Sequence, residues 1–394
     1  MNKKHYIVLF FCALLPFLGY FLNPNIAFND SYAYLGYICH NPSIPNSLET
    51  PLFLGIISFF PCSIIYLKVY ELILYYITLI ALAHFGEQAF NKEKGWFVSL
   101  FVAGLSPLLF LEAIKFENDQ LGWCIAFIAL AVTAFALNQQ KLKKFSLLGL
   151  ATLLFGLSFL FWKGTIVLFA MLGFSSIILF VFWLLPSAII FFTTFIGYLQ
   201  ASFSSNMVAE NQPGAAIIFL AFFVPFLLDI PKRWKVLGIV SFLVAVLIPK
   251  FALFCLPFVA LGLVNMVNKV ETEEKYLKVR RHLPNFTLFC LIMCFLFAYI
   301  GFSAVPSSEQ LQQDKEAIQL AQDLNINLYN DWDYGWHLTY LGYNTTYRAG
   351  YPNPDYNNLQ KPYIALTTQD LNHLKCLTIK QVRQTKTIKC LETD

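Results

Sequence analysis

The feature that most constrains how this chain can fold is a series of long apolar runs that recur along most of its length. The first run begins after Met1-Asn2-Lys3-Lys4 and continues to Phe21. A run of about 20 mainly apolar residues is long enough to cross the roughly 30 Å hydrocarbon core of a bilayer as a helix. The later runs cover roughly 66–85, 96–113, 121–138, 145–161, 164–184, 187–203, 214–230, 235–249, 251–267 and 285–304. The pattern predicts a mainly α, polytopic membrane bundle of about eleven spans.

The shortage of charged residues excludes several other classes of protein. Only 13% of the residues are charged and 58% are hydrophobic, whereas soluble domains carry roughly 25% charged residues. The chain therefore lacks the polar surface of a soluble enzyme, a disordered protein or a nucleic-acid binder, and no nucleic-acid partner is expected. The nine cysteines are scattered without paired spacing, so a zinc site is not expected either.

Two apolar segments decide the number and parity of the spans. The first run resembles a secretory signal peptide, but no small-residue cleavage site follows it, so we expect an uncleaved anchor. Residues 51–66 are also apolar enough to suggest a span. If these residues formed a membrane span, every later Lys cluster would fall on the outer side of the membrane. We therefore expect a helix over 51–64 that lies along the outer surface and begins at Thr50-Pro51, with proline at its first helical position.

The distribution of Lys and Arg predicts the orientation. Loops that alternate toward the N-terminal side hold fifteen of these residues, and the opposite side holds four before residue 305. The positive-inside rule then places the N-terminus in the cytoplasm and residues 305–394 outside, at the cell exterior or in the lumen of the endoplasmic reticulum. The fifteen are Lys3, Lys4, Lys92, Lys94, Lys141, Lys143, Lys144, Lys232, Arg233, Lys235, Lys269, Lys275, Lys278, Arg280 and Arg281, and the four are Lys68, Lys115, Lys163 and Lys250.

Composition divides the chain into a membrane domain, 1–304, and a small external α/β domain, 305–394. The membrane domain includes an external loop, 24–65, that contains the surface helix. In the external domain, Ser307 or Ser308 is placed to cap a helix. The apolar residues of that helix, at helical spacing, are Leu311, Ile318, Ala321 and Leu324. Strands are expected at 325–330 and 362–366, and a hairpin at 376–391.

Two pairs of cysteines fall on the side expected to be oxidising. Cys39 and Cys62 belong to the loop 24–65, and Cys376 and Cys390 flank the expected hairpin. Disulfides form and persist in such compartments. For each pair, a disulfide and two free thiols are both open at this point.

Acidic residues are scarce, and several of them fall in loops expected outside. Asp30 follows the first span, Glu117 and Asp119 lie in the loop 112–120, and Glu210 lies in the loop 204–213. Three carboxylates around an open position suit a hard divalent cation, which binds oxygen ligands and can neutralise a lipid-linked phosphate. The alternative is that each acid simply solvates a loop or a helix end.

Several segments, in order along the chain, resemble the catalytic subunit of oligosaccharyltransferase, a member of the GT-C class of membrane glycosyltransferases. Asn29-Asp30-Ser31-Tyr32 resembles the first acidic motif of that family, and Glu117-Asn118-Asp119 resembles the second, usually Asp-Asn-Glu, with the acids exchanged. Residues 208–213, Val-Ala-Glu-Asn-Gln-Pro, are similar to its external-loop glutamate motif. Asp331-Trp332-Asp333-Tyr334-Gly335 matches the signature Trp-Trp-Asp-Tyr-Gly at four of five positions, and Pro249-Lys250-Phe251 resembles the start of a late span where the family has Arg.

The resemblance implies roles for these residues. We expect Asp30 and Asp119 to bind Mn²⁺ or Mg²⁺, and Asp30 with either Glu117 or Asp119 to engage the acceptor amide. Glu210 would position the acceptor. Trp332 and Asp333 would form a pocket for the hydroxyl of Ser or Thr two residues after the acceptor Asn. Lys250 would contact the donor phosphate.

One departure bears on the acceptor. Asp331 stands at the first Trp of the family's signature, which in the family completes the pocket beside the Trp that Trp332 matches. A carboxylate supplies neither the indole N–H nor the apolar wall of Trp. Two possibilities are open for the acceptor: the enzyme discriminates less strictly among sequons, or the acceptor is not a protein sequon.

Other polar residues have two interpretations each. His337 contacts substrate or is a structural or solvated histidine, and His40 helps at the metal site or does not. Lys163 and Lys250 lie at the outer ends of expected spans, where their side chains can extend to the interface. Asn344-Thr345-Thr346 is an Asn-X-Thr site that is either glycosylated or an unmodified loop.

Three functional classes remain. The favoured one is an oligosaccharyltransferase-like enzyme that moves a glycan from a polyprenyl- or dolichyl-linked phosphate donor to Asn in the Asn-X-Ser/Thr sequon of an acceptor polypeptide; a single-subunit enzyme is compatible with the sequence. The second is a GT-C glycosyltransferase that uses a polyprenyl-phosphate sugar to extend a lipid or a glycan. The third is a transporter or flippase, which should place ionisable groups near the bilayer midplane, whereas the acids here gather at one expected surface.

Overall fold

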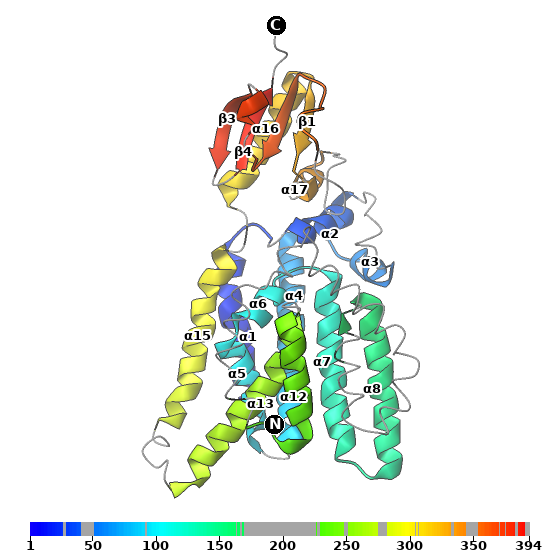
Figure 1. The fold of residues 1–394 in the computed structure, drawn as a ribbon, viewed down its shortest axis with the longest axis vertical. Coiled ribbons are helices and arrows are strands. Elements are labelled where there is room, and N and C mark those ends of the chain that lie inside the picture. Colours follow the sequence, from blue (N-terminus) through cyan, green and yellow to red (C-terminus); the bar gives the residue numbers. More distant parts are fainter. Residues whose placement is uncertain are drawn as a thin grey trace. The chain divides into compact units, whose positions relative to one another are not determined.

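The structure is a computed structural model of the chain, drawn in Figure 1. It describes residues 1–26, 29–40, 51–90, 93–162, 164–165, 168, 226, 229–247, 251–274, 282–303, 305, 307–331, 335–343, 354–369, 371–374, 376–382 and 385–390. The chain divides into two compact units. The first unit comprises Met1–Leu18, Leu72–Ala113 and Asn118–Tyr299, and the second comprises Gly19–Glu71, Ile114–Glu117 and Ile300–Asp394.

Long apolar helices dominate the first unit, as the sequence predicts. They are α1 (Lys3–Leu22), α4 (Ile64–Phe90), α7 (Asn118–Leu137), α8 (Lys141–Phe161), α12 (Lys232–Leu247), α13 (Ala252–Thr272) and α15 (Leu283–Ser303), of which α1, α4 and α15 continue into the second unit. Six helices are long and apolar enough to cross a membrane, or up to seven with one bent pair, among the described residues. The expected count of about eleven is not confirmed, and the expected spans 164–184, 187–203 and 214–230 lie largely outside the described residues.

The expected continuous span 96–113 is instead broken in the middle. After a short 3₁₀ turn, η1 (Glu93–Trp96), the chain forms α5 (Phe97–Leu105) and α6 (Pro107–Ala113), and the two helical segments are bent by 77°. The break lies at Ser106, whose backbone is extended (φ −127°, ψ 106°). Proline has no N–H to donate and disfavours the helical conformation of the residue before it, so Pro107 begins a new helix.

Small residues allow close helix contacts in the first unit. A Cβ atom on Gly104 of α5 would lie 2.6 Å from Cβ of Cys290 in α15. A Cβ atom on Gly122 of α7 would lie 2.6 Å from Cβ of Trp162, which follows α8; α7 and α8 run side by side in Figure 1. Such contacts are the usual way in which membrane helices approach each other closely.

The second unit begins with two short helices, α2 (Asn29–His40) and α3 (Pro51–Ile57). The helix α3 starts at Pro51 as predicted and is too short to span a bilayer, but it ends at Ile57 rather than at residue 64. Phe53 and Ile57 of α3 are buried, so one face of this helix packs against the protein.

The C-terminal part of the second unit is a mixed α/β domain, as predicted. Its helices are α16 (Ser308–Asp323) and α17 (Gly335–Tyr340), with a single 3₁₀ turn at Asn372–Leu374 among the described residues. The strands are β1 (Asn327–Asn330), β2 (Tyr363–Thr367), β3 (Leu377–Val382) and β4 (Thr385–Cys390), in the order β1-β2-β4-β3. The strands β1 and β2 are parallel, and β4 pairs antiparallel with both β2 and β3.

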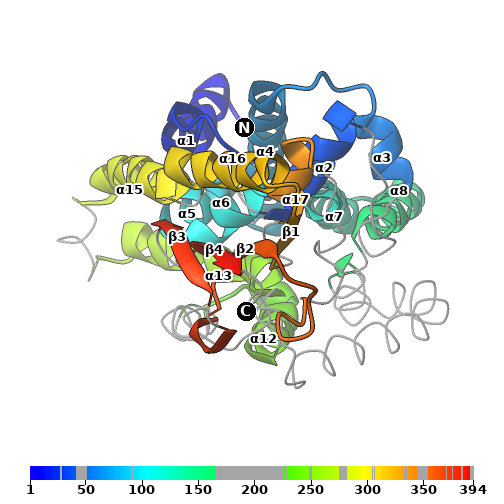
Figure 2. The ribbon, with the colours of Figure 1, turned by 90° about the horizontal axis from the view of Figure 1, so that it is seen from above.

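Hydrophobic residues on both sides of this sheet bury the central strand β2 completely. The helix α16 lies along one side (Figure 2), where Ala317 and Ala321 pack with Leu328 and Ile364. On the other side Tyr363 packs with other apolar residues, namely Tyr356, Ala365, Leu371, Ile388 and Cys390. The predicted cap of α16 is confirmed, because the Ser307 side chain accepts a hydrogen bond from the backbone N–H of Gln310 at 3.2 Å.

Both candidate cysteine pairs, for which the sequence left two possibilities open, are disulfides. Cys39 at the end of α2 is bonded to Cys62, just before α4. Cys376 and Cys390 close the β3–β4 hairpin. Both bonds lie within the second unit, and the free cysteines Cys12, Cys124, Cys255, Cys290 and Cys294 all lie in the first.

Candidate functional site

The helix α2 carries the first acidic motif and joins it to the second. Asn29 and Asp30 form its first turn. The next residue, Ser31, is fully buried, and its hydroxyl oxygen accepts a hydrogen bond from the backbone N–H of Phe116 at 2.9 Å. Phe116 directly precedes Glu117. The segments that hold Asp30 and Glu117 therefore lie beside each other, although 85 residues separate the two bonded positions.

Aromatic packing surrounds this junction. Phe116 contacts the rings of Tyr34 in α2, Phe53 in α3 and Tyr70 in α4, with centroids 6.2, 5.9 and 5.7 Å away. These contacts explain why the loop before Glu117 belongs to the second unit, whereas Asn118 begins α7 in the first.

The second acidic motif begins with Glu117, one residue before α7, and continues into the first turn of that helix. The side-chain amide of Asn118 donates to the carbonyl of Phe161 at 2.6 Å, and that of Gln120 donates to the carbonyl of Ala113 at 2.6 Å. Asp119 lies in the first turn of α7, where a negative charge complements the positive end of the helix dipole. Glu117 and Asp119 are both half-buried.

The short helix α17 starts where the signature segment ends. It begins at Gly335, the last residue of the signature, and packs against α2 in both ribbon views (Figures 1 and 2). The ring of Tyr32 lies 5.5 Å from that of Tyr340, and His40 is hydrogen-bonded to the Tyr340 carbonyl at 3.0 Å. The helix α2 therefore contacts the residue before the second acidic motif and the helix that follows the signature segment.

A buried polar cluster lies at this contact. Nδ1 of His337 is 3.5 Å from a carboxylate oxygen of Asp314 in α16, and the His337 ring is 4.2 Å from that of Tyr32. All three side chains are at most 2% exposed. Burial raises the pKa of Tyr32 well above its usual value, with Tyr340 and Asp314 adding to the effect, so its hydroxyl stays protonated. The burial of His337 favours the structural interpretation over direct substrate contact.

Asp331 is a structural anchor. It is 4% exposed, and its carboxylate accepts hydrogen bonds from the hydroxyl of Tyr356 at 2.9 Å, from Oγ1 of Thr367 at 2.9 Å and from the backbone N–H of Thr368 at 2.8 Å. Its own N–H donates to the carbonyl of Leu366 at 3.0 Å. Asp331 therefore ties the end of β1 to the loop after β2, immediately before Trp332.

The second unit also contains a buried Lys and a buried Glu that interact electrostatically and were not expected from the sequence. Lys68 and Glu71 in α4 are 2% and 0% exposed. The ammonium group of Lys68 donates to the carbonyls of Tyr20 and Asn23 at 2.7 and 2.6 Å, at the end of α1, and the Tyr20 hydroxyl donates to Glu71 at 3.4 Å. Glu117 is an electrostatic neighbour of Glu71. The available signal was a Lys and an acid three residues apart inside an apolar run, which is rare in membrane spans.

Not every expected site residue falls where its side chain is described. Asp30 is placed in α2 but its side chain is not described, and Glu210, Lys250, Trp332 and Asp333 lie outside the described residues. Lys163 and Asn344 lie outside them as well. No group of three His, Cys, Asp or Glu residues that could hold a metal ion occurs within the described part of the chain.

The hypothesis that His40 helps at a metal site with Asp30 is wrong. The two residues lie ten positions apart on one helix, which corresponds to roughly 15 Å along its axis. His40 instead binds the backbone of Tyr340.

Comparisons with known proteins identify the fold. Scans against known protein families and against curated protein sequences found no match. The archaeal oligosaccharyltransferase AglB from Archaeoglobus fulgidus, solved with an inhibitory peptide and a dolichol-phosphate, superposes with a TM-score of 0.57 at 13% identity, over 88% of this chain and 65% of that one. ArnT from Cupriavidus metallidurans, solved in the apo state, superposes with a TM-score of 0.56 at 14% identity, over 99% of this chain and 98% of that one.

Both proteins are GT-C glycosyltransferases, and at these identities the likeness shows the fold. The chain is an integral membrane protein of GT-C architecture with a small α/β domain. It spans 65% of the length of AglB, so the activity and ligands of AglB do not transfer with the fold.

Proposed function

We propose that this protein is an oligosaccharyltransferase-like enzyme that transfers a glycan from a polyprenyl-linked phosphate donor to Asn in Asn-X-Ser/Thr acceptors. The observation that carries this proposal is the position of α2. Its Ser31 is bonded to Phe116 beside the second acidic motif, and its Tyr32 packs on His337 just after the signature segment. The helix that carries the first motif thus contacts the residue just before the second motif and a residue just after the signature.

The acceptor amide needs activation, and the carboxylates can supply it. An amide nitrogen is a poor nucleophile because its lone pair is delocalised into the carbonyl. In this proposal Asp30 and either Glu117 or Asp119 accept hydrogen bonds from the two N–H groups of the acceptor amide, which weakens the conjugation and raises the nucleophilicity of the nitrogen.

The carboxylate oxygens of Asp119 and Glu117 are the type of donor that Mg²⁺ and Mn²⁺ prefer. We assign Asp30 and Asp119 as the residues that would hold the ion, with Glu117 nearby. When bound, a divalent cation would stabilise the charge on the departing phosphate.

The remaining proposed roles rest on the resemblance alone. Glu210 positions the acceptor, Trp332 and Asp333 recognise the hydroxyl at the second residue after Asn, and Lys250 contacts the donor phosphate. The buried Asp331 supports the recognition pocket indirectly, since it anchors the chain immediately before Trp332. In this proposal residues 305–394 lie outside the cytoplasm, together with the loop 24–65.

Two observations favour a second candidate function: the share of each solved structure that the chain covers, and the contacts of Asp331. The match covers 98% of ArnT but only 65% of AglB. In addition, Asp331, which replaces the first Trp of the signature, is hydrogen-bonded at the β1–β2 junction. A GT-C glycosyltransferase that uses a polyprenyl-phosphate sugar to extend a lipid or glycan would need the carboxylates but not a sequon pocket.

One experiment separates the two candidates. Purified protein is given a lipid-linked glycan extract and either an Asn-X-Thr or an Asn-X-Ala peptide, with and without a chelator. Transfer to the Thr peptide alone, lost in chelator, is the expected result. Equal use of both peptides, or extension of a lipid-linked sugar with no transfer to peptide, would assign the second function. Full activity in chelator would remove the metal from either proposal.

A further inference from the structure

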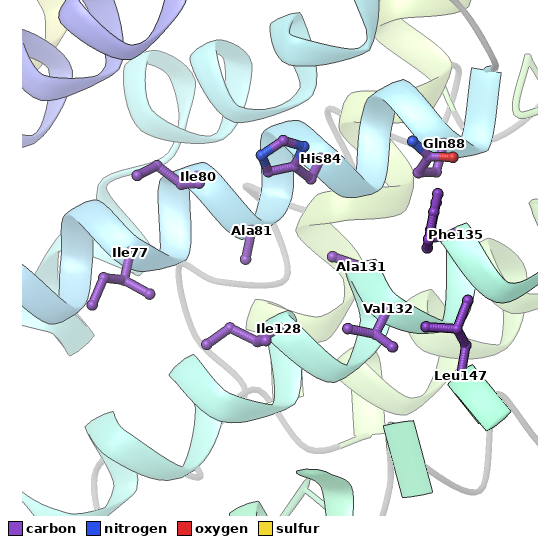
Figure 3. Close-up of a pocket in the computed structure, with 10 residues that line it drawn as sticks. All are labelled: Ile77, Ile80, Ala81, His84, Gln88, Ile128, Ala131, Val132, Phe135 and Leu147. Atoms are coloured by element: carbon purple, nitrogen blue, oxygen red, sulfur yellow. The ribbon is translucent and has the colours of Figure 1, made fainter. Parts of the chain in front are cut away.

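An apolar groove lies between three helices of the first unit and includes none of the residues of the proposed site. It encloses about 390 Å³. Figure 3 shows residues of α4 facing residues of α7, with Leu147 of α8 at one end. Eight of its ten lining residues are apolar, and the polar ones, His84 and Gln88, lie toward the end of α4. The apolar members are Ile77, Ile80, Ala81, Ile128, Ala131, Val132, Phe135 and Leu147.

Hydrogen bonds join α4 to α7, and to the residue that follows α7, near the two ends of the groove. At one end, the thiol of Cys124 donates to the carbonyl of Leu74 at 3.6 Å. At the other, the side-chain amide of Asn138 donates to the carbonyl of Gln88 at 2.7 Å. From Ile77 to Gln88 the helix rises roughly 16 Å, which is about half of the roughly 30 Å hydrocarbon core. The groove is therefore as long as one leaflet of the bilayer.

The Gln88 end of the groove is positively charged. The ammonium group of Lys143 lies 5.4 Å from the centre of the Phe135 ring, which lines the groove. Arg233 donates to Asn138 and to the carbonyl of Leu137 at 3.3 and 3.1 Å. The helix α8 begins here with Lys141 and has no side-chain cap at its N-terminus, so its first backbone N–H groups also favour an anion.

The nearest carboxylate on the described part of α4 is already neutralised. Glu87 lies 2.9 Å from the N-terminal amino group of Met1 and 3.5 Å from His84. From residue 120 to residue 209 the sequence contains no Asp or Glu, so α7 beyond Asp119, α8 and the turn between them contribute cations only.

We propose that this groove binds one acyl chain of an anionic phospholipid, whose phosphate lies at Lys141 and Lys143. The apolar wall is about as long as an acyl chain within one leaflet of the bilayer. The positive charge at the Gln88 end of the groove attracts an anionic headgroup. The site is independent of the transfer reaction, because none of its residues belongs to the proposed catalytic set.

The test measures lipid binding by delipidated protein with native mass spectrometry. Phosphatidylglycerol and phosphatidylcholine with the same acyl chains are titrated separately. We expect wild type to bind phosphatidylglycerol about ten-fold more tightly, given the known attraction of basic residues for anionic lipids. The double variant Lys141→Gln/Lys143→Gln should lose this preference while it keeps its affinity for phosphatidylcholine. Ala131→Phe, which fills the groove, should weaken the binding of both lipids.

The control is Lys315→Gln, which removes an exposed cation from α16, an element that does not line the groove. It should behave as wild type. Equal binding of the two lipids by wild type, or an equal loss of preference in the control, would overturn the proposal. So would displacement of phosphatidylglycerol by an equimolar polyprenyl phosphate, which would assign the groove to a different lipid.

Discussion

The two units of the chain are stabilised in different ways. In the first, helices approach through glycine and apolar side chains, as at Gly104, whose neighbour is Cys290. In the second, buried polar groups join distant segments: Ser31 to Phe116, Lys68 to the end of α1, and Asp331 to the loop after β2. Polar groups are costly to bury unless they are hydrogen-bonded, so such groups specify one arrangement of segments where apolar contacts alone would tolerate several.

This difference indicates where the chemistry is expected. A site that handles charged substrates needs fixed polar groups, and both segments that the structure places beside α2 belong to the second unit. The first unit contains most of the long apolar helices, together with Asp119 at the start of α7. The predictions below test this contrast.

The largest expected effect is on activity. Asp30→Ala and Asp119→Ala should each lower turnover by at least about 100-fold, because each removes a carboxylate proposed to activate the acceptor. The assay is glycan transfer to an Asn-X-Thr peptide by purified, folded protein. Asp323→Ala, at the exposed end of α16, is the control and should retain activity. Near-normal turnover in the two test variants would remove the carboxylates from the mechanism.

Asp331→Leu should destabilise the second unit by about 3 kcal/mol or more, since it strands the hydroxyls of Tyr356 and Thr367 and the N–H of Thr368 without their acceptor. Asp331→Trp, which restores the residue found in the resembling family, should destabilise as much. The measurement is the denaturant midpoint for protease cleavage within residues 305–394. A Trp variant as stable as wild type would show that the anchor is dispensable.

A smaller effect is expected in the first unit. Gly104→Ala places a Cβ atom against Cys290 and should cost about 1–3 kcal/mol through overpacking. Gly149→Ala is the matched control, because nothing lies within 4 Å of the Cβ position on that glycine of α8. Thermal unfolding in a bilayer mimetic compares the two. Equal stability would mean that α5 and α15 do not depend on close approach.

The smallest effect concerns an exposed pair in the second unit. Hydrogen bonds from Lys380, at 2.6 Å, and from Gln312 lower the pKa of the Glu316 carboxyl. A depressed pKa contributes stability above the unfolded value of about 4.3, and that stability is lost as the pH falls through the folded value. Glu316→Gln should therefore be slightly less stable than wild type at pH 7 and equal to it near pH 3. A large difference at pH 7 would contradict the small value expected for surface pairs.

Local patterns predicted much of the fold. Apolar runs predicted α1, α4, α7, α8, α13 and α15 within a few residues, because length and hydrophobicity are properties of each segment alone. Ser307 capping α16 and the start of α3 at Pro51 were equally local signals. The break at Ser106 was missed, although Pro107 was visible, because the apolar run continues through it and hydrophobicity does not record a helix direction.

The sequence by itself therefore determined the class of protein, the positions of most helices and the candidate carboxylates. Only the tertiary structure decided which segments meet: that α17 packs on α2, that His337 is buried against Asp314 and Tyr32, and that Asp331 serves the β1–β2 junction instead of a pocket. The physical reason is that hydrogen bonds and burial depend on partners dozens to hundreds of residues away. The sequence around a single Asp, His or Lys does not indicate which group that side chain will contact.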